Sequence, residues 1–294
     1  MGTTLEIDLT KGIIEKRETD PDLTRLFLGG KGVNARIFWE RVPPETEPFS
    51  PENLLVIDTC VLTGTIVPAA NRGVITFKSP LTGHLMHSAM GGFWPAEIKH
   101  AGYDTIIIRG KSAAPVYLWI NDDDVVLRDA THLWGKGTPD TVQAIQEDLG
   151  NDKAHVACIG PAGENKCYSA SIESSVGAGA SRAGPGAVMG NKNLKAIVAY
   201  GTRDVRVAKP QRLVELCEEI MEKSGPLSAT LDQFAPLVAA EMVDIGMYGN
   251  VDERYVDLMS DSTFKKDLDG LHELAHEWHE RRDGSGSCHN CGFR

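Results

Sequence analysis

The chain has 294 residues, of which 41% are hydrophobic and 24% are charged, proportions that are ordinary for a soluble globular protein. Its 30 Lys and Arg residues against 41 Asp and Glu residues give a formal net charge of −11, which argues against a nucleic-acid-binding surface. No apolar run approaches the roughly 20 residues that a membrane span needs, and the amino terminus lacks the basic and apolar zones of a signal peptide. We therefore expect a cytoplasmic protein with no membrane span and no nucleic-acid partner.

The first two thirds of the chain predict a strand-rich domain. Residues 4–16 are expected to form a hairpin, because LEIDL alternates into a Thr-Lys-Gly turn that is followed by IIEKR. Helices are predicted near 34–41 and 140–149. The other predicted strands are short, rich in β-branched residues and bounded by Gly, Pro or Asn. They are 54–60, 73–77, 105–109, 116–121, 125–128, 154–159 and 194–199.

The composition changes after Ala208-Lys209-Pro210, where QRLVELCEEIMEKS places apolar residues at helical spacing behind a proline. Helical patterns continue in LDQFAPLVAAEMVDIG and LDGLHELAHEWHERR. The sequence therefore predicts an α+β fold with two parts: a strand-rich cofactor-binding domain over 1–208, and the beginning of a helical domain over 209–294.

Many of the 30 glycines gather in four clusters, at 28–32, 90–94, 160–165 and 177–190. Glycine allows positive φ and a close approach of backbone N–H groups to an anion, so such loops together could form a cradle for phosphates, although each alone could equally be a tight turn. Arg72 in PAANRG and Arg182 in ASRAG are flanked by small residues, where a guanidinium can reach phosphate or ring oxygens. No cluster spells GxxxxGK[ST], and LGGKGV is not a clean GxGxxG after a strand, so neither a nucleoside triphosphate nor a Rossmann dinucleotide is favoured.

Six cysteines divide into two groups. Those that are widely separated are predicted to be buried core thiols: Cys60, Cys158, Cys167 and Cys217. Cys288 and Cys291 form a CxxC, which in an acidic chain without a secretion signal favours a metal or cluster site over a disulfide. Because two thiolates cannot complete a four-cysteine site, we expect the other ligands on polypeptide that this chain lacks.

Histidines offer a competing metal hypothesis. His272, His276 and His279 would share one helical face, and HELAH fits the HExxH pattern, with Glu273 as the general base of a zinc enzyme. The segment lacks a third ligand at a fixed spacing, and a solvated amphipathic helix is the alternative. His84 and His87 would face opposite sides of a strand, which disfavours a shared metal.

Several runs of this sequence resemble the aldehyde ferredoxin oxidoreductase family of tungsten or molybdenum bis-pterin enzymes. They are PPETEPFSPENLL, KSPLTG, GGFWPAEIKHAGYD, IGPAGEN, GAVMGNKNLKAI and CHNC, and they cover essentially the whole chain. The resemblance implies that the strand-rich domain is the base on which the metal-bound pterins sit, while two helical domains close over them. It also implies a [4Fe–4S] cluster beside the pterin, held by CxxCxxxC and a distant fourth cysteine.

Carried onto this chain, the resemblance places Arg72 between cluster and pterin. It assigns the pterin phosphates and a bridging Mg²⁺ to two loops, which contain Ala89, Met90, Gly91 and Gly92, and Arg182, Ala183 and Gly184. The family usually has Asn where Ala89 stands, a change that a backbone-carbonyl ligand would survive and a side-chain ligand would not. Cys288 and Cys291 would bind the cluster, and the third cysteine would follow Arg294.

The activity implied is oxidation of an aldehyde to a carboxylic acid at a tungstopterin or molybdopterin, with electrons leaving through the cluster to ferredoxin or another iron–sulfur carrier. MGGFW looks closer to the benzoyl-coenzyme A reductase branch, which implies ring reduction as the alternative. A non-catalytic binding or assembly module is a third hypothesis. The resemblance requires the absent carboxy-terminal domains or a separate subunit as a partner and allows a homodimer, and we expect the isolated chain to be inactive.

Overall fold

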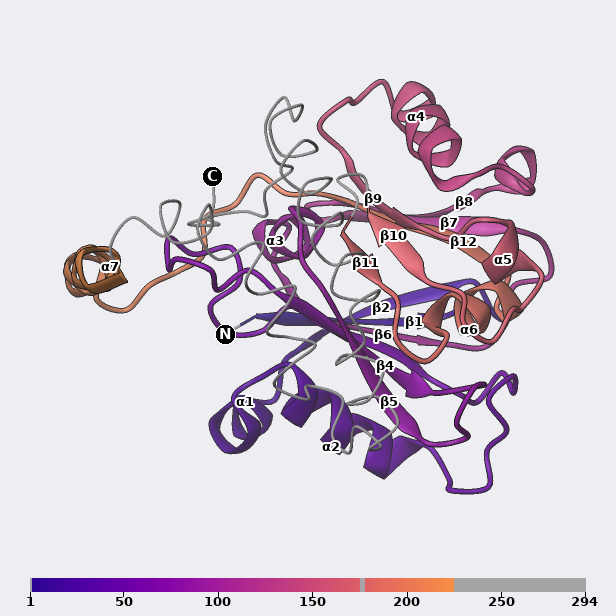
Figure 1. Cartoon of the computed structure of the whole chain (residues 1–294), viewed down its shortest axis with the longest axis horizontal. Helices are drawn as coiled ribbons and strands as arrows, with labels where there is room; N and C mark the ends of the chain where they lie inside the picture. The colour runs from indigo at the N-terminus through magenta and orange to yellow at the C-terminus, as the bar shows by residue number, and fades with distance from the viewer. Residues whose placement is uncertain (1, 175–177, 225–294) are drawn as a thin grey trace, which may run out of the picture. The chain divides into compact units, whose positions relative to one another are not determined.

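The computed structural model describes residues 2–174 and 178–224, which form two six-stranded sheets and the helices around them (Figure 1). The strands are β1 (Thr3–Asp8), β2 (Ile13–Glu18), β3 (Leu55–Asp58), β4 (Gly73–Lys78), β5 (Leu85–Met90), β6 (Tyr103–Arg109), β7 (Val116–Asn121), β8 (Asp124–Asp129), β9 (His155–Cys158), β10 (Ile172–Ser174), β11 (Gly179–Ala180) and β12 (Leu194–Tyr200). The helices are α1 (Pro21–Phe27), α2 (Lys31–Arg41), α3 (Trp94–His100), the 3-10 helix η1 (Thr131–Leu133), α4 (Thr138–Leu149), α5 (Pro161–Glu164), α6 (Pro185–Asn191) and α7 (Pro210–Ser224).

The first sheet has the strand order β2-β1-β6-β3-β4-β5. Strands β1 and β2 form the predicted amino-terminal hairpin, whose turn is tied by Asp8 Oδ1 accepting from the N–H groups of Thr10 and Lys11. Strand β1 runs parallel to β6, and the other pairs are antiparallel. The hairpin of β4 and β5 closes the opposite side, so that β5 is an edge strand.

The second sheet has the order β11-β10-β9-β12-β7-β8, with a parallel β7–β12 pair among antiparallel ones. The short strand β11 is one of its edges, and it contacts β5 of the first sheet. The edges of both sheets therefore meet on one side of the domain.

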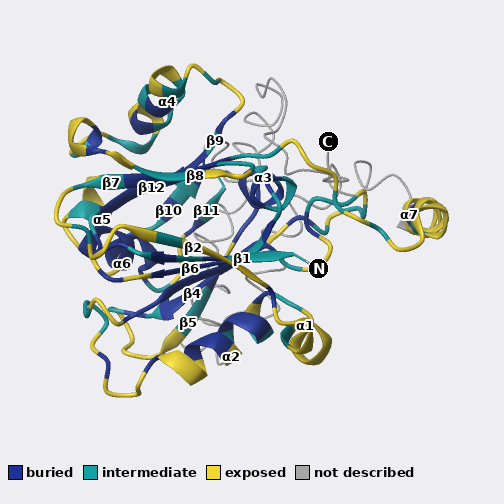
Figure 2. Cartoon of the chain, turned by 180° about the vertical axis from the view of Figure 1, so that it is seen from behind, coloured by how far each residue is buried: buried dark blue, intermediate teal, exposed yellow. Residues whose placement is uncertain are grey.

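The main hydrophobic core lies between the two sheets. Alternate strand residues supply it, such as Leu5 and Ile7 of β1 and Leu118 and Ile120 of β7, because successive side chains of a strand point to opposite faces. Helix α2 covers part of the outer face of the first sheet, and α4 covers that of the second, each with its own apolar cluster. The result is a helix–sheet–sheet–helix arrangement, in which buried residues fill the inner layers (Figure 2).

The predicted fold class is confirmed, since strands dominate and helices flank mixed sheets. All seven strands predicted after the hairpin are present with ends shifted by at most a few residues, and the two predicted helices correspond to α2 and α4. Strand β5 was anticipated only as a strand-like stretch around His84 and His87, and the short elements α1, α3, η1, α5, α6, β10 and β11 were not predicted. All four of the helices α1, α3, α5 and α6 have proline in their first turn, and α6 contains two glycines, so these segments carry turn signals rather than helical ones.

Helix α7 agrees with the predicted change to helical structure after residue 209. The remainder of the predicted helical domain lies outside the described residues. Among the helices of residues 2–174 and 178–224, none is both long enough and apolar enough to cross a membrane.

Candidate cofactor-binding site

Asn71 and Arg72 lie at the open end of the β4–β5 hairpin. Gly73 pairs with Met90, so Arg72 and Gly91 continue the two strands side by side. The hydroxyl of Thr63 binds both backbone polar groups of Arg72. Its Oγ1 donates to the Arg72 carbonyl at 2.8 Å and accepts from the Arg72 N–H at 3.4 Å. The Arg72 side chain is exposed. This end of the hairpin therefore presents a guanidinium from a rigid backbone.

Asn71 ties the two strand ends together. Its side chain is 5% exposed, and its Nδ2 donates to the carbonyl of Gly92. Its Oδ1 is buried and has no hydrogen-bond partner among the described residues. A buried amide oxygen without a donor is costly, so this atom is available to accept from a ligand.

The loop that follows β5 is buried backbone with little side chain. Met90 is fully buried in the core, which leaves only its backbone for a ligand, whereas Ala89 is exposed on the opposite face of the strand. Gly91 and Gly92 are buried, and Gly92 has φ of 79°, a conformation that favours glycine. Any contribution of Met90, Gly91 and Gly92 to binding must come from N–H and carbonyl groups.

The loop of Arg182, Ala183 and Gly184 is held against the β4–β5 hairpin. The Arg182 N–H donates to Ser88 Oγ at 3.1 Å, and Ser79 Oγ donates to the Ala183 carbonyl at 2.7 Å. Ala183 and Gly184 both have positive φ, 65° and 81°, before α6 begins at Pro185. This sharp change of direction leaves the Arg182 side chain exposed.

The two predicted loops therefore meet on one hairpin. Ser88, which binds the Arg182 backbone, is two residues before Met90 on the same strand, a distance of about 7 Å along β5. Neither Arg72 nor Arg182 forms an ion pair with any residue of the described ranges, so both exposed guanidiniums are available to an anion. The arrangement places two cations, a strained glycine-rich backbone and an unpaired acceptor around one sheet edge.

The other two glycine clusters serve packing. Gly30 donates its N–H to the buried carboxylate of Asp58 at 2.6 Å, which fixes the start of α2. In GPAGEN, Gly163 lies against α6 so closely that a Cβ on Gly190 would lie 1.9 Å from the Gly163 carbonyl oxygen. The interpretation of the GPAGEN cluster as part of a phosphate cradle is therefore replaced by one of close helix contact.

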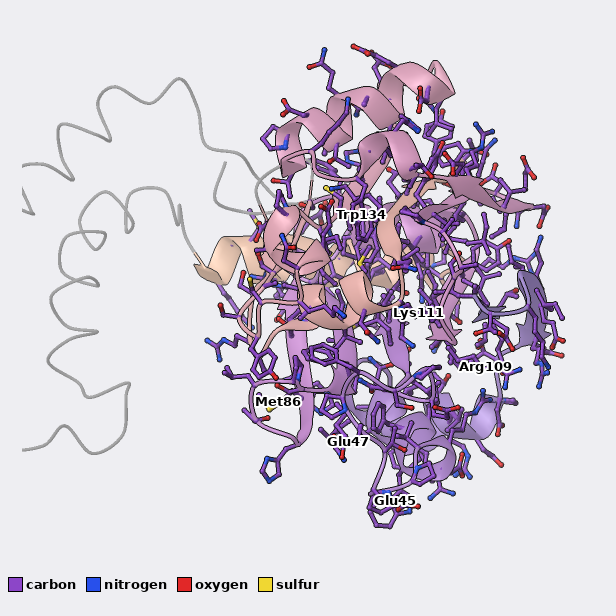
Figure 3. The ribbon with its side chains drawn as sticks, turned by 90° about the vertical axis from the view of Figure 1, so that its right-hand side faces the viewer. Glu45, Glu47, Met86, Arg109, Lys111 and Trp134 are labelled. Carbon is purple, nitrogen blue, oxygen red and sulfur yellow. The ribbon has the colours of Figure 1, made fainter. Side chains whose placement is uncertain are left out.

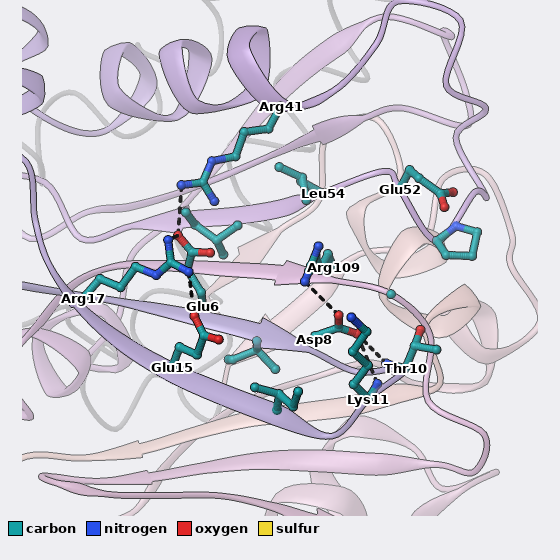
Figure 4. Close-up of a pocket in the computed structure, with 15 residues that line it drawn as sticks. Glu6, Asp8, Thr10, Lys11, Glu15, Arg17, Arg41, Glu52, Leu54 and Arg109 are labelled. Atoms are coloured by element: carbon teal, nitrogen blue, oxygen red, sulfur yellow. Dashed lines mark hydrogen bonds and ion pairs between the residues drawn. The ribbon is translucent and has the colours of Figure 1, made fainter.

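A cavity of about 630 Å³ lies on the outer face of the first sheet and contains none of the predicted site residues (Figure 4). Six of its eight charged side chains form ion pairs: Arg17 with Glu15 at 2.6 Å, Arg41 with Glu6 at 2.9 Å, and Arg109 with Asp8 at 3.0 Å. The other two, Lys11 and Glu52, have opposite charges. In Figure 3, Met86 of the β4–β5 hairpin and Arg109 of the cavity lie on opposite sides of the view. The charges of the cavity are thus already neutralised, and it is a poor candidate for the chemistry.

The histidines of the described residues do not form a metal pair. His84 is exposed in the turn before β5, and its Nδ1 contacts the Thr82 carbonyl at 2.6 Å. His87 Nδ1 bonds Thr76 Oγ1 at 2.8 Å, and burial, aided by the charge of Lys31, lowers the pKa of His87. No group of three potential His, Cys, Asp or Glu ligands occurs within the described ranges. The HELAH histidines, His272 and His276, and Glu273 and His279 lie outside those ranges.

The cysteine predictions are confirmed in part. Cys158 and Cys217 are buried, and burial raises the pKa of Cys158 to about 12. Cys60 is half-buried, with its pKa raised to about 11 by the same cause. The prediction for Cys167 is wrong: it is exposed, because the chain turns away from the core at Lys166, where φ is 56°. Cys288 and Cys291 lie outside the described residues.

Sequence reasoning missed the side chains that hold these loops, Asn71, Ser79 and Ser88. Asn71 directly precedes Arg72, and Ser79 stands in KSPLTG, so both lay within segments already singled out. Ser88 had no such signal, since only the pairing of β5 places it beside Arg182.

The sequence of this region matches known proteins. Residues 4–201 match the model of the aldehyde ferredoxin oxidoreductase amino-terminal domain. A tungsten-containing aldehyde ferredoxin oxidoreductase of Pyrococcus abyssi is 42% identical over 222 residues, which are 76% of this chain and 37% of the relative. The WOR-like subunit of an aliphatic sulfonate oxidoreductase of Pyrococcus furiosus is 36% identical over 216 residues, covering 68% of this chain and 34% of the relative.

A solved structure agrees with these relatives. The active-site complex BamBC of benzoyl coenzyme A reductase, bound to 1,5-dienoyl-CoA, superposes with a TM-score of 0.74 at 53% identity, covering 75% of this chain and 34% of that chain. The present chain thus spans about a third of the length of these proteins. Its matching residues include the β4–β5 hairpin and the loop of Arg182, Ala183 and Gly184. The chain belongs to the aldehyde ferredoxin oxidoreductase family, and residues 4–201 are the family's amino-terminal domain.

Proposed function

We propose that the strand-rich domain, residues 1–208, is the platform for a tungsten- or molybdenum-bound pterin in an oxidoreductase of the aldehyde ferredoxin oxidoreductase type. The observation that carries this proposal is the meeting of two loops on the β4–β5 hairpin, which brings the backbones of Arg72 and Arg182 to one sheet edge. The tungsten-containing relatives support the choice of cofactor.

The described residues fit such a group. A pterin ring carries N–H donors that the unpaired Oδ1 of Asn71 could accept, and its phosphates match the two unpaired guanidiniums of Arg72 and Arg182. Ser79 uses only one of the two lone pairs of the Ala183 carbonyl, so the other could hold the Mg²⁺ ion of such a cofactor. The backbone carbonyl of Ala89 would be the second protein ligand of that ion.

When bound, the metal-bound pterin would supply the two-electron redox chemistry, and a [4Fe–4S] cluster would pass electrons on singly. The residues of this chain would bind and orient the pterin, with Arg72 on the side facing the cluster. Cys288 and Cys291, in a helical domain that begins near residue 209, would supply two cluster ligands. Two more, and the rest of the substrate pocket, would come from polypeptide that corresponds to the unmatched part of the relatives.

Aldehyde oxidation with ferredoxin as the electron acceptor is the first candidate reaction, in keeping with the relative from Pyrococcus abyssi. Reduction of an aromatic coenzyme A thioester is the second. A specific observation favours it: identity to the benzoyl coenzyme A reductase complex is 53%, against 42% to the aldehyde ferredoxin oxidoreductase, over similar shares of the chain. For either reaction we propose a cytoplasmic enzyme with ferredoxin or another iron–sulfur protein as its electron partner.

The test is to produce the chain together with polypeptide that corresponds to the carboxy-terminal part of its relatives, in a cell that makes tungstopterin. We expect tungsten or molybdenum and about four iron atoms per assembly. An Arg182→Ala variant should lose most of the tungsten, whereas Arg36→Ala, which removes an exposed helix ion pair with Glu40, should keep it. A folded assembly without either metal would instead favour a non-catalytic binding module.

The purified assembly then distinguishes the two reactions. Aldehyde-dependent reduction of ferredoxin would favour the first candidate, and turnover of dienoyl-coenzyme A without aldehyde turnover would favour the second.

A further inference from the structure

The buried side-chain hydroxyl of Ser79 donates one hydrogen bond, and its local contacts determine which group accepts it. The residue is fully buried, and its Oγ accepts from the N–H groups of Leu81 at 3.1 Å and Thr82 at 3.2 Å. A hydroxyl oxygen has two lone pairs and one proton, so these two donors fix its orientation. The proton is thereby directed to the Ala183 carbonyl, 2.7 Å away.

Ser88 holds the neighbouring residue of the same loop. Its side chain is 1% exposed, on the face of β5 that carries Met90 into the core, and its Oγ accepts from the Arg182 N–H at 3.1 Å. Two serines on one hairpin thus bind two consecutive residues of the loop, one through an N–H group and the other through a carbonyl.

The loop needs such support because its backbone is unfavourable. Ala183 has φ of 65°, in the left-handed region that residues with a Cβ rarely adopt, and Gly184 follows at 81°. A Cβ on Gly184 would lie 2.0 Å from the Tyr168 carbonyl oxygen, so the loop is also packed from its other side. A conformation of this kind persists only where surrounding contacts determine it.

We propose that Ser79 and Ser88 are positioning residues that set the shape of the cofactor loop, with Ser79 aiming the second lone pair of the Ala183 carbonyl at the magnesium ion of the pterin phosphates. This role rests on the proposed function. The inference adds two residues to the proposed site. Neither touches the substrate, and both determine how tightly the cofactor is retained.

The experiment compares Ser79→Ala and Ser88→Ala in the assembly of the chain with its carboxy-terminal polypeptide. Tungsten and magnesium are measured over time during dialysis against EDTA, which competes for the magnesium. Each variant removes about one hydrogen bond that holds the loop, so we expect the metals to be lost about five to ten times faster than from the unsubstituted assembly.

Thr141→Val is the matched control. Thr141 is also fully buried, and its Oγ1 donates to a carbonyl, that of Gly137, at the same 2.7 Å, but it belongs to α4 on the outer layer. This variant should retain tungsten as the unsubstituted protein does. Ser79→Thr keeps the hydroxyl and should restore retention to within about twofold of the unsubstituted value, which a role in packing alone would not require.

The outcomes separate the two levels of inference. Normal metal content in the unsubstituted assembly together with normal retention in Ser79→Ala and Ser88→Ala overturns the positioning role and leaves the proposed function standing. Absence of tungsten and molybdenum from the unsubstituted assembly overturns both. If Ser79→Ala does not fold, Ser88→Ala decides the question, since its serine makes a single contact with the loop.

Discussion

Two lysines are fully buried at the ends of α6 and β12, which is unusual for a residue that carries a charge. Lys192 donates its Nζ to the carbonyls of Gly110 at 3.1 Å and Pro51 at 3.3 Å, without a carboxylate in contact. Lys195 instead pairs with the buried carboxylate of Glu164 at 2.5 Å and donates to the Lys136 carbonyl. The same type of side chain is therefore stabilised in two different ways, by backbone carbonyls in one case and by an ion pair in the other.

Stability should rise with pH because of Lys192. Burial lowers its pKa to about 7 from 10.5, so between these values the unfolded chain binds a proton that the folded chain does not. The free energy of unfolding should therefore increase from pH 7 towards pH 10, by at most about 1.4 kcal/mol per pH unit. Urea denaturation at several pH values measures this slope, and Lys192→Met should flatten it. An equal slope in both proteins would show that another group titrates.

Lys195 and Glu164 should be strongly coupled. Lys195→Met leaves the Glu164 carboxylate buried with only the Gly135 N–H as donor, and we expect a loss of about 3–5 kcal/mol in the free energy of unfolding. Adding Glu164→Gln removes the unpaired charge while its amide oxygen still accepts from Gly135. The double variant should recover more than half of the loss in urea denaturation. Additive losses would mean that the pair is not coupled.

At the scale of elements, α5 and α6 are held together by glycine. Both helices are short, four and seven residues, and neither would be stable alone. They approach so closely that a Cβ on Gly190 would lie 1.9 Å from the Gly163 carbonyl oxygen, and a Cβ on Gly163 would lie 3.0 Å from that of Gly186. Their helical form is thus a product of tertiary packing, which orients the start of α6 and with it the loop of Ala183 and Gly184.

Gly190→Ala should separate these two helices. Its Cβ would lie 1.9 Å from a backbone oxygen that cannot move aside, so we expect a loss of about 3 kcal/mol or more in the free energy of unfolding. Gly137→Ala is the control, since Gly137 has φ of −62° and its Cβ would meet nothing closer than 3.8 Å. This second change should stay within about 0.5 kcal/mol of the unsubstituted protein. Thermal and urea unfolding of both variants measure the difference.

The dependence of short helices on tertiary packing also explains which elements could be predicted from the sequence and which could not. The strands 116–121 and 194–199 were predicted almost to the residue, because β-branched runs between turn residues have a local signature. Helices such as PGAVMGN and PAGE have none, since glycine and proline disfavour a helix in any isolated segment. Contacts between distant segments decide their structure, and a single sequence does not contain those contacts in readable form.

At the scale of the molecule, the candidate site also combines residues that a local sequence pattern marks with residues that only distant contacts bring together. Arg72 and Arg182 stood out because small residues flank them, and the resemblance to a family supplied the loops around them. The residues that join these loops, Ser88 among them, depend on strand pairing and on the contact between β5 and β11. Their chemistry is that of ordinary buried serines, so no local pattern marks them.

The two serine contacts join residues 104 and 94 positions apart in the chain, from the first sheet to the loop that precedes α6. During synthesis the hairpin of β4 and β5 emerges long before the loop does, and the loop gains its left-handed turn only when the later segment has docked. Under the proposed function, this loop could therefore contribute to cofactor binding only after the later segment has docked on the hairpin. A nascent chain that has not yet produced α6 would offer a pterin only the earlier half of the proposed site, which contains Asn71, Arg72 and the loop after β5.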